Sequence, residues 1–345
     1  MKKAIMLYSK GYEQLDYGPD HPFRPERFTK TKNYFMTKFP DLKILEPKAI
    51  RPEELLQVHS KFYIEHVKNL SNKGYGYLSV DTPVFPGIFE WALLYCGAAK
   101  MGIDLLLSGY DVVFNPCGGL HHAKRDSDGG FCVFNDVAFA AVYAEKQGRK
   151  PVIIDIDAHA GDGTMEILYE KPILKISIHE DPHYLYPGNG FIDQFGEKEG
   201  YGFNINIPLP PLAGDNDLNL AFSEIVIPAV KKFKPDIIIL QSGVDGYYRD
   251  PLTSLSYTGW GYRRVAKLLA SFNLPILMLG GGGYDLNVVP ILWAIIFGEL
   301  IGNSEGILED LSKMDEKAKL SNEQIVKRTK KVINQILKSH PFFLE

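Results

Sequence analysis

Five apolar runs, rich in valine, isoleucine and leucine, constrain the fold of this chain more than any other feature. They lie at residues 111–115, 151–157, 172–179, 235–243 and 274–283. Continuous apolar runs are typical of strands buried on both faces, as in parallel sheets. Segments with helical patterning lie between or beside them, at residues 87–109, 134–148, 216–233 and 260–272. This alternation predicts an α/β fold with a single, mostly parallel sheet and helices on both faces.

Two further segments, residues 2–9 and 201–210, are expected to be extended. No repeat, low-complexity linker or shift in composition divides the chain, so we expect one domain over residues 1–345. Within it we distinguish a core of residues 1–300 from a C-terminal helical extension of residues 305–345.

The extension carries a strongly amphipathic segment at residues 321–340. Helical spacing places four apolar residues on one face, namely Ile325, Val332, Ile336 and Leu337, with lysines elsewhere. Such a stripe is typical of a helix packed on the surface of its own domain. An exposed arm or an oligomer contact is the alternative, and the oligomeric state stays open.

Composition excludes several classes of function. The formal net charge of −4 gives no electrostatic footprint for nucleic acid. The three cysteines form no CxxC pair, which argues against a disulfide framework and against a thiolate zinc site. No uncharged stretch reaches the ~20 apolar residues of a membrane span, and the apolar run near the N-terminus is too short for a signal peptide. We therefore expect a soluble, cytoplasmic protein without a membrane partner.

Polar or glycine-rich sequence follows every apolar run. The residues concerned are His121 and His122, Asp155, Asp157 and His159, Ser177 and His179, Ser242 and Asp245, and Tyr284 after four glycines. Because ligands of open α/β sheets bind beyond the carboxyl ends of the strands, five such coincidences predict a functional site at one edge of the sheet.

The segment DIDAHAGDG, residues 155–163, holds the chemistry of this site. In an extended chain Asp155, Asp157 and His159 share one face, where carboxylates repel unless a positive charge lies between them. Asp157, His159 and Asp245 form an Asp₂His set suited to Zn²⁺ or Fe²⁺, and three protein ligands leave positions for water and substrate. The alternative, a salt-bridged structural cluster, needs arginines, and Arg249 is the only one in the local sequence around these ligands.

Acid–base groups are available beside this metal set. A histidine next to a metal-bound water can take its proton, which makes His121 and His122 candidates. Asp155 and Asp162 remain to orient the two rings. Tyr284 can donate a hydrogen bond to a developing oxyanion.

Other chemistries find less support. Cys132 is a candidate nucleophile, but its apolar surroundings favour a buried structural thiol. The four glycines at residues 280–283 lack the Lys-Ser/Thr of a phosphate-binding loop, and no GxSxG motif of a serine hydrolase is present.

Four segments taken together resemble the signature motifs of histone deacetylases, including the prokaryotic class I-like and acetoin-utilisation types. They are GGLHHAKRDSDGGFCVFND, DIDAHAGDG, QSGVD with the following DPL, and LGGGGY. The similarity runs from HPFRPER, near residue 21, to about residue 300. The resemblance implies an arginase/deacetylase fold and zinc-dependent removal of acetyl groups from lysine-type amines.

The resemblance also implies roles for individual residues. Asp157, His159 and Asp245 match zinc ligands, His121 and His122 match the tandem active-site histidines with Asp155 and Asp162 behind them, and Tyr284 matches the tyrosine that polarises the acetyl carbonyl. A structural potassium ion is implied at Asp155, Asp157, His159, Ser177 and Ile178. Substrate contacts are implied for the tunnel residues Phe131, Tyr186 and Leu252, for Gly130 and Gly282, and for Asp81 at the rim. Arg27 matches an arginine that lines an internal cavity.

Two positions depart from the family pattern. Ala160 replaces the second histidine of the usual HHG, a position that is not a ligand. Tyr186 stands where a tunnel phenylalanine is usual, which makes the tunnel more polar and bears on acyl preference.

Two other functions compete with a deacetylase. Ureohydrolases on the same fold have a segment that resembles DAHxD and a later DxD segment. In this chain Gly161 stands where DAHxD has its second aspartate. Gly246 and Tyr247 follow Asp245, so the second aspartate of DxD is also missing. An inactive acetyl-lysine-binding module would lack ligands, histidines or the tyrosine, and all are present here. The amine itself stays open between an acetylated protein lysine, an acetylpolyamine and another small acylated amine.

Overall fold

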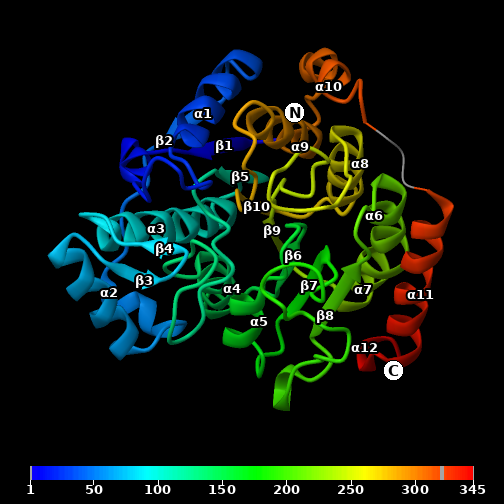
Figure 1. Cartoon of the computed structure of the whole chain (residues 1–345), viewed down its shortest axis with the longest axis horizontal. Coiled ribbons are helices and arrows are strands. Elements are labelled where there is room, and N and C mark those ends of the chain that lie inside the picture. Colours follow the sequence, from blue (N-terminus) through cyan, green and yellow to red (C-terminus); the bar gives the residue numbers. More distant parts are fainter. Residues whose placement is uncertain (1, 319–321, 345) are drawn as a thin grey trace.

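An eight-stranded sheet forms the centre of the protein (Figure 1). The computed structural model describes residues 2–318 and 322–344. The strand order is β2-β1-β5-β10-β9-β6-β7-β8, and every neighbouring pair is parallel. The strands are β1 (Ala4–Leu7), β2 (Lys43–Leu45), β5 (Val112–Asn115), β6 (Pro151–Asp155), β7 (Leu174–Glu180), β8 (Asn204–Leu209), β9 (Ile237–Gln241) and β10 (Ile276–Leu279). The predicted parallel sheet is confirmed.

The sequence analysis missed β2 and a small antiparallel hairpin outside the main sheet. The hairpin joins β3 (Tyr77–Ser79) and β4 (Thr82–Pro83). β2 is a three-residue edge strand whose side chains are exposed or half-buried, so it lacks the apolar run that marks the inner strands.

Helices cover both faces of the sheet. They are α1 (Glu26–Lys38), α2 (Lys61–Lys73), α3 (Ile88–Leu107), α4 (Asp136–Lys146), α5 (Asp162–Ile167), α6 (Asp215–Ala221), α7 (Ile227–Phe233), α8 (Gly259–Ala270), α9 (Val289–Ile301), α10 (Leu308–Met314), α11 (Glu323–Ser339) and α12 (Pro341–Leu344). Among the described residues, no helix is both long and apolar enough to cross a membrane.

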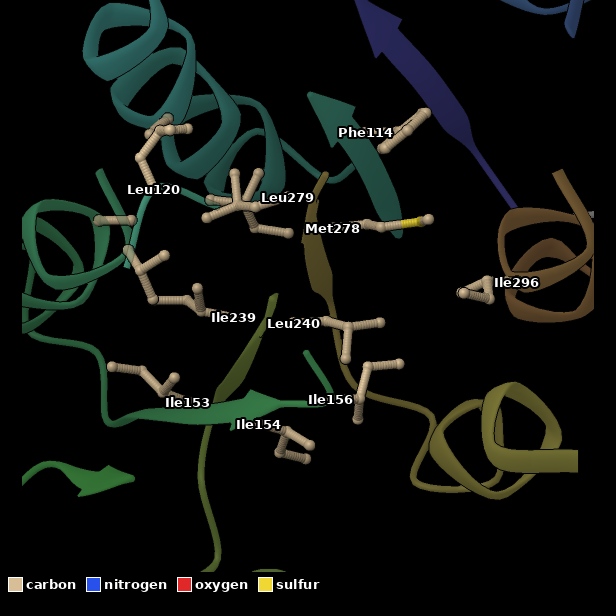
Figure 2. Packing of buried hydrophobic residues seen from close by; sticks show 14 of the residues in the cluster. Phe114, Leu120, Ile153, Ile154, Ile156, Ile239, Leu240, Met278, Leu279 and Ile296 are labelled. Atoms are coloured by element: carbon tan, nitrogen blue, oxygen red, sulfur yellow. The ribbon is translucent and has the colours of Figure 1, made fainter. Parts of the chain in front are cut away.

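The core shows why the inner strands are apolar on both sides. Figure 2 shows adjacent residues of one strand, such as Met278 and Leu279, pointing to opposite faces. On one face these side chains pack toward α3 and α4, and on the other toward α8 and α9. All four residues of β10 are fully buried. Because both faces of the strand are buried, its sequence does not alternate between apolar and polar residues. The resulting continuous apolar run is the pattern that predicted these strands.

The single helix predicted over residues 216–233 is wrong in detail. α6 is followed by a π-helical turn at Phe222–Val226 and then by α7. Pro228 lies in the first turn of α7, where its missing N–H cannot continue the α-helical ladder. A π-turn at this point accommodates the lost hydrogen bond.

α11 packs its apolar side against α6 and β8, as the stripe predicts. Its buried residues are Ile325, Thr329, Ile333 and Ile336, whereas Val332 and Leu337 are half-buried. Ile325 and Ile336 of the predicted stripe are thus buried, and Thr329 and Ile333 are buried in addition to them. Ser321, the first residue of the predicted segment, lies outside the described residues. Just beyond α11, the His340 Nε2 lies 2.7 Å from the backbone carbonyl oxygen of Asn204 in β8.

Candidate active site

The predicted site residues gather at the carboxyl edge of the sheet. Asp157 and His159 follow β6, and Asp245 follows β9. The tandem histidines follow β5, and Tyr284 follows β10. These four strands are neighbours in the sheet, so parallel pairing alone brings the four loops together.

Asp157, His159 and Asp245 converge on one point. Their ligand atoms all lie within 4.8 Å of one another, and the side chains are buried. The Nδ1 of His159 lies 3.1 Å from the Oδ1 of Asp157 and 2.8 Å from the Oδ2 of Asp245. Within residues 2–318 and 322–344, no lysine or arginine nitrogen lies within 4.0 Å of these carboxylates. A structural salt-bridge cluster is therefore not supported.

The remaining carboxylate oxygens of this cluster are held by the protein. The Oδ2 of Asp157 accepts hydrogen bonds from Gln241 Nε2 at 2.8 Å and from the Gly282 N–H at 2.7 Å. The Oδ1 of Asp245 accepts the Ala158 N–H at 2.8 Å. Each carboxylate thus directs its other oxygen at the His159 imidazole. Two oriented carboxylates and one imidazole fit the donor preferences of a divalent transition metal.

Three glycines let the backbone approach these groups closely. A Cβ on Gly243 would lie 2.1 Å from the Oδ2 of Asp157, and one on Gly282 would lie 2.2 Å from the Oδ2 of Asp245. A Cβ on Gly130 would lie 2.3 Å from the Cδ2 of His122. Any other residue at these positions would displace a group of the cluster.

Each tandem histidine has its own buried carboxylate. The Nδ1 of His121 lies 2.7 Å from Asp155 Oδ2, and the Nδ1 of His122 lies 2.7 Å from Asp162 Oδ1. The two Nε2 atoms lie 3.1 Å apart and face the same space. These are the pairs expected from the sequence. Lys124, which the sequence analysis did not single out, places its Nζ 3.2 Å from Asp162 Oδ2.

The two histidines differ in their pKa. Burial lowers the pKa of His122 to about 4, an effect that the neighbouring His121 reinforces and Asp162 only partly offsets. Burial acts in the same direction on His121, but the carboxylates of Asp155 and Asp157 outweigh it and raise its pKa to about 9. These values belong to the ion-free protein, and a cation held by Asp155 or Asp157 would lower the pKa of His121 by offsetting those charges.

Tyr284 is positioned from two sides. Burial raises the pKa of its phenol well above the usual value, so the hydroxyl stays protonated and can donate a hydrogen bond. Its ring packs against Phe131 at a centroid distance of 6.0 Å. Its backbone N–H donates to Asp250 Oδ2 at 2.8 Å. A narrow cavity of about 20 Å³, room for a water-sized group, lies among Tyr284, Phe131 and the tandem histidines.

Arg27 is buried beside this cavity. It donates from Nη2 to the Gly281 carbonyl oxygen at 2.5 Å, and its guanidinium lies over the rings of Phe23 and Trp293. Its Nε and Nη1 have no hydrogen-bond partner among the described residues. Arg27 thus contacts Phe23 and Gly281, which line the cavity, and its expected role in lining an internal cavity stays a prediction.

The expected tunnel residues differ in their exposure and contacts. Tyr186 is 46% exposed, and its ring centroid is 5.0 Å from that of His122. Phe131 has a positive φ of 70°, a strained conformation for a bulky residue, and Tyr17 donates to its carbonyl oxygen at 2.9 Å. Leu252 is half-buried and donates its N–H to Asp250 Oδ1 at 3.0 Å.

Asp81 lies in the turn between β3 and β4 and is half-buried. Its Oδ2 accepts the Gly130 N–H at 3.2 Å, which connects the hairpin to the glycine beside His122. Its Oδ1 faces the hydroxyls of Ser79 at 2.8 Å and Thr82 at 3.0 Å. The carboxylate is thus fixed in place, with part of its acceptor capacity already used.

The expected potassium site is only partly visible. Asp155 and Ser177 are register partners in β6 and β7. The Ser177 hydroxyl lies 2.8 Å from the Nδ1 of His179, and Asp155 Oδ1 accepts the Asp157 N–H at 3.2 Å. Backbone carbonyls would supply most of the ligands, so the potassium ion stays a prediction.

Cys132 does not fit a nucleophilic role. Burial raises the pKa of its thiol well above the usual range, and its Sγ contacts the Gly130 carbonyl oxygen at 3.3 Å. A neutral thiol of this kind is a poor nucleophile. The structural interpretation is therefore preferred.

Sequence reasoning missed a set of supporting polar residues. They are Lys124, Asn135, Asp136, Gln241 and Asp250. Asp136, for example, accepts the backbone N–H groups of Gly119 and Leu120 and so holds the loop before the histidines. Their position next to the site motifs was the signal that could have found them. Asn135 and Asp136 are the last two residues of the first motif, GGLHHAKRDSDGGFCVFND. Gln241 lies near the end of an apolar run, and Asp250 is the first residue of DPL.

Comparison with known proteins identifies the relatives of this chain. Acetoin utilization protein AcuC of Bacillus subtilis is 37% identical over 326 residues, covering 89% of this chain and 84% of the relative. Histone deacetylase B of Dictyostelium discoideum is 32% identical, covering 80% of this chain and 68% of the relative. A crystal structure of the HDA15 HD domain superposes with a TM-score of 0.86 at 26% identity, covering 99% of this chain and 96% of that one.

The structural likeness confirms the arginase/deacetylase fold that the resemblance implies. Relatives named as deacetylases also favour this activity over that of a ureohydrolase. Residues 21–300 match the family model described as histone deacetylase domain. The chain therefore belongs to the histone deacetylase family of metal-dependent hydrolases.

Proposed function

We propose that this deacetylase removes acetyl groups from the side-chain amine of acetyl-lysine in proteins, with one zinc ion held by Asp157, His159 and Asp245. The observation that carries the proposal is the convergence of these three donors next to two carboxylate-backed histidines and a half-buried tyrosine. Fe²⁺ suits the same donors and is the alternative native metal. A structural potassium ion at Asp155 and Ser177 completes the proposed site.

The chain's own residues then divide the work. The bound metal would polarise the amide carbonyl and lower the pKa of a water. His122, neutral because of its lowered pKa, accepts the proton from that water, and Asp162 stabilises the imidazolium. His121 is placed to return a proton to the departing amine. Tyr284 donates its hydroxyl to the carbonyl oxygen, where negative charge develops.

An acetylpolyamine or another small acylated amine is the alternative substrate, because the catalytic groups contact only the amide. A deacetylation screen over acetyl-lysine peptides, acetylpolyamines and longer acyl-lysines tests the proposal. Turnover of acetyl-lysine peptides above all others is the expected result. Turnover confined to polyamines would overturn the protein substrate, and no turnover of any acylated amine would overturn the whole assignment.

The two histidines are expected to give different pH profiles. If His122 is the general base, kcat/KM of the intact enzyme falls on the acidic side of neutrality, as His122 becomes protonated. Replacement of His122 by Ala should remove this acidic limb from the residual activity, whereas the His121→Ala variant should keep it. The measurement is kcat/KM against pH for the three proteins with equal metal content. Loss of the limb in His121→Ala alone would reverse the assignment.

Asp81→Asn is expected to separate peptide from polyamine substrates. The change removes the charge but keeps an oxygen that can accept the Gly130 N–H. A peptide donates backbone N–H groups to the carboxylate, so its turnover should fall with modest salt dependence. A polyamine offers only a distal ammonium, so its turnover should fall mainly at low ionic strength.

The measurement is turnover of both substrates at several salt concentrations, with Asp126→Asn as the control. Asp126 is an exposed carboxylate in the nearby loop and should leave both rates unchanged. Unchanged peptide turnover in the Asp81→Asn variant would remove Asp81 from the rim role.

A further inference from the structure

One buried carboxylate, that of Asp250, joins the two loops that carry Tyr284 and Leu252. Its Oδ2 accepts the Tyr284 N–H at 2.8 Å, and its Oδ1 accepts the Leu252 N–H at 3.0 Å. Asp250 lies between β9 and α8, whereas Tyr284 lies between β10 and α9. The side chain is 9% exposed. Both oxygens are thus used for backbone groups of the site.

The backbone before Tyr284 has little stiffness of its own. Residues 280–283 are four glycines, and Gly281 and Gly283 have positive φ values of 85° and 132°. Glycine populates many backbone conformations, so this run does not by itself fix the direction of the tyrosine that follows. The hydrogen bond from the Tyr284 N–H to the Asp250 side chain supplies a fixed point at the end of the run.

The loop of Asp250 is itself anchored. The Thr253 hydroxyl donates to the Asp245 carbonyl oxygen at 2.7 Å. In the described part of the chain, no lysine or arginine forms an ion pair with Asp250. The neighbouring Arg249 instead reaches Asp285, at 3.6 Å, across the same two loops. Asp250 therefore has backbone N–H groups as its partners, and its two oxygens fix the backbone of Tyr284 and of Leu252.

We propose that Asp250 is a positioning residue that sets the place of the Tyr284 hydroxyl relative to the tunnel wall at Leu252. The proposal rests on the proposed function of Tyr284 as the carbonyl donor. Among the described residues the Asp250 side chain forms hydrogen bonds only with the Leu252 and Tyr284 N–H groups, and it does not line the cavity, so we expect its effect on turnover to pass through Tyr284. A misplacement of a reacting group by about 1 Å can cost ~10²-fold in rate.

The test is a double-mutant cycle between Asp250 and Tyr284, measured as kcat and KM for an acetyl-lysine peptide. Asp250→Asn keeps the size and leaves one acceptor oxygen, and Asp250→Ala removes both. We expect kcat to fall by ~10-fold for the Asn variant and ~10²-fold for the Ala variant, with KM and metal content little changed. In the Tyr284→Phe background, the same substitutions should cost less than about 2-fold, because the hydroxyl they position is gone.

Arg249→Gln is the matched control, because it removes the exposed link between the same loops and leaves both backbone hydrogen bonds intact. Wild-type kcat is expected for this variant. An Asp250 effect that keeps its full size in the Tyr284→Phe background, or that comes with loss of metal, would overturn the positioning role. If Asp250→Ala does not fold, the Asn variant alone completes the cycle.

Failure of this inference is distinguishable from failure of the proposed function. If Tyr284→Phe itself deacetylates at the wild-type rate, the proposed role of Tyr284 is wrong, whatever Asp250 does. If Tyr284→Phe is slow and the Asp250 substitutions add to it in full, only the inference fails.

Discussion

Asp245→Ala is expected to abolish metal binding and deacetylation together. Asp245 supplies one of the three converging donors and is fully buried. Its removal also leaves His159 Nδ1 without its nearest carboxylate and the Ala158 N–H without its acceptor. Because loss of even an outer hydrogen-bond partner typically costs 10–100-fold in metal affinity, loss of a direct ligand should cost at least ~10²-fold.

The measurement is metal content per chain together with turnover, before and after dialysis against a chelator. The wild-type protein should hold one divalent transition metal, since one set of three donors is present in the described residues. Asp193→Asn, an exposed carboxylate without a hydrogen-bond partner among them, is the control and should keep metal and activity. Two tightly bound transition metals in the wild type would contradict the mononuclear site.

Tyr284→Phe is expected to lose ~10²–10³ in kcat while it keeps the metal and most substrate affinity. The phenol is buried and protonated, so it donates one hydrogen bond to the carbonyl oxygen, and this bond strengthens as negative charge develops there. The change removes one oxygen atom and leaves the ring against Phe131.

Single-turnover kinetics with metal analysis would separate this effect from binding. The expected pattern is a low kcat with KM and metal content near their wild-type values. A Phe variant that deacetylates as fast as the wild type would show that another group polarises the carbonyl.

The sheet and its catalytic edge could be predicted because burial leaves a plain pattern. Strands such as β9 and β10 are buried on both faces, so their sequences are almost purely apolar, and the polar residues after them stand out. Parallel pairing then brings the loops after neighbouring strands together without further information. The same reasoning names Asp155 and Asp162 as acceptors for the histidines, whereas the pairing of each aspartate with one histidine comes only from the family resemblance.

The supporting residues could not be predicted in this way. Gln241 is one more polar residue at the end of a strand, and its contact with Asp157 depends on the distance between two loops far apart in sequence. Asp250 accepts hydrogen bonds from backbone N–H groups. Every residue except proline carries such a group, so no side chain in the sequence marks its partners. β2 could not be predicted because an exposed edge strand shows no apolar run. The break after α6 could not be predicted because it depends on one proline within an otherwise helical pattern.

The order of the two histidine pKa values shows a further limit of the sequence. Reasoning from the carboxylates alone makes His122 the more basic ring, because Asp155 is shared with potassium. In the ion-free structure, the pKa of His122 is the lower one, because burial and the proximity of His121 outweigh Asp162. His122 nevertheless stays the preferred general base, since a base must be neutral before it accepts a proton.

The position of α11 matters for how this chain can be divided. β8 is the last strand of the sheet, and its outer side has no neighbouring strand in the described part of the chain. α11 and His340 cover part of that side, whereas the match to the family ends at residue 300. A chain shortened at that residue would present an unpaired strand edge beside exposed apolar side chains, the arrangement that promotes self-association. The end of the match to the family model is thus not a safe place to cut this protein.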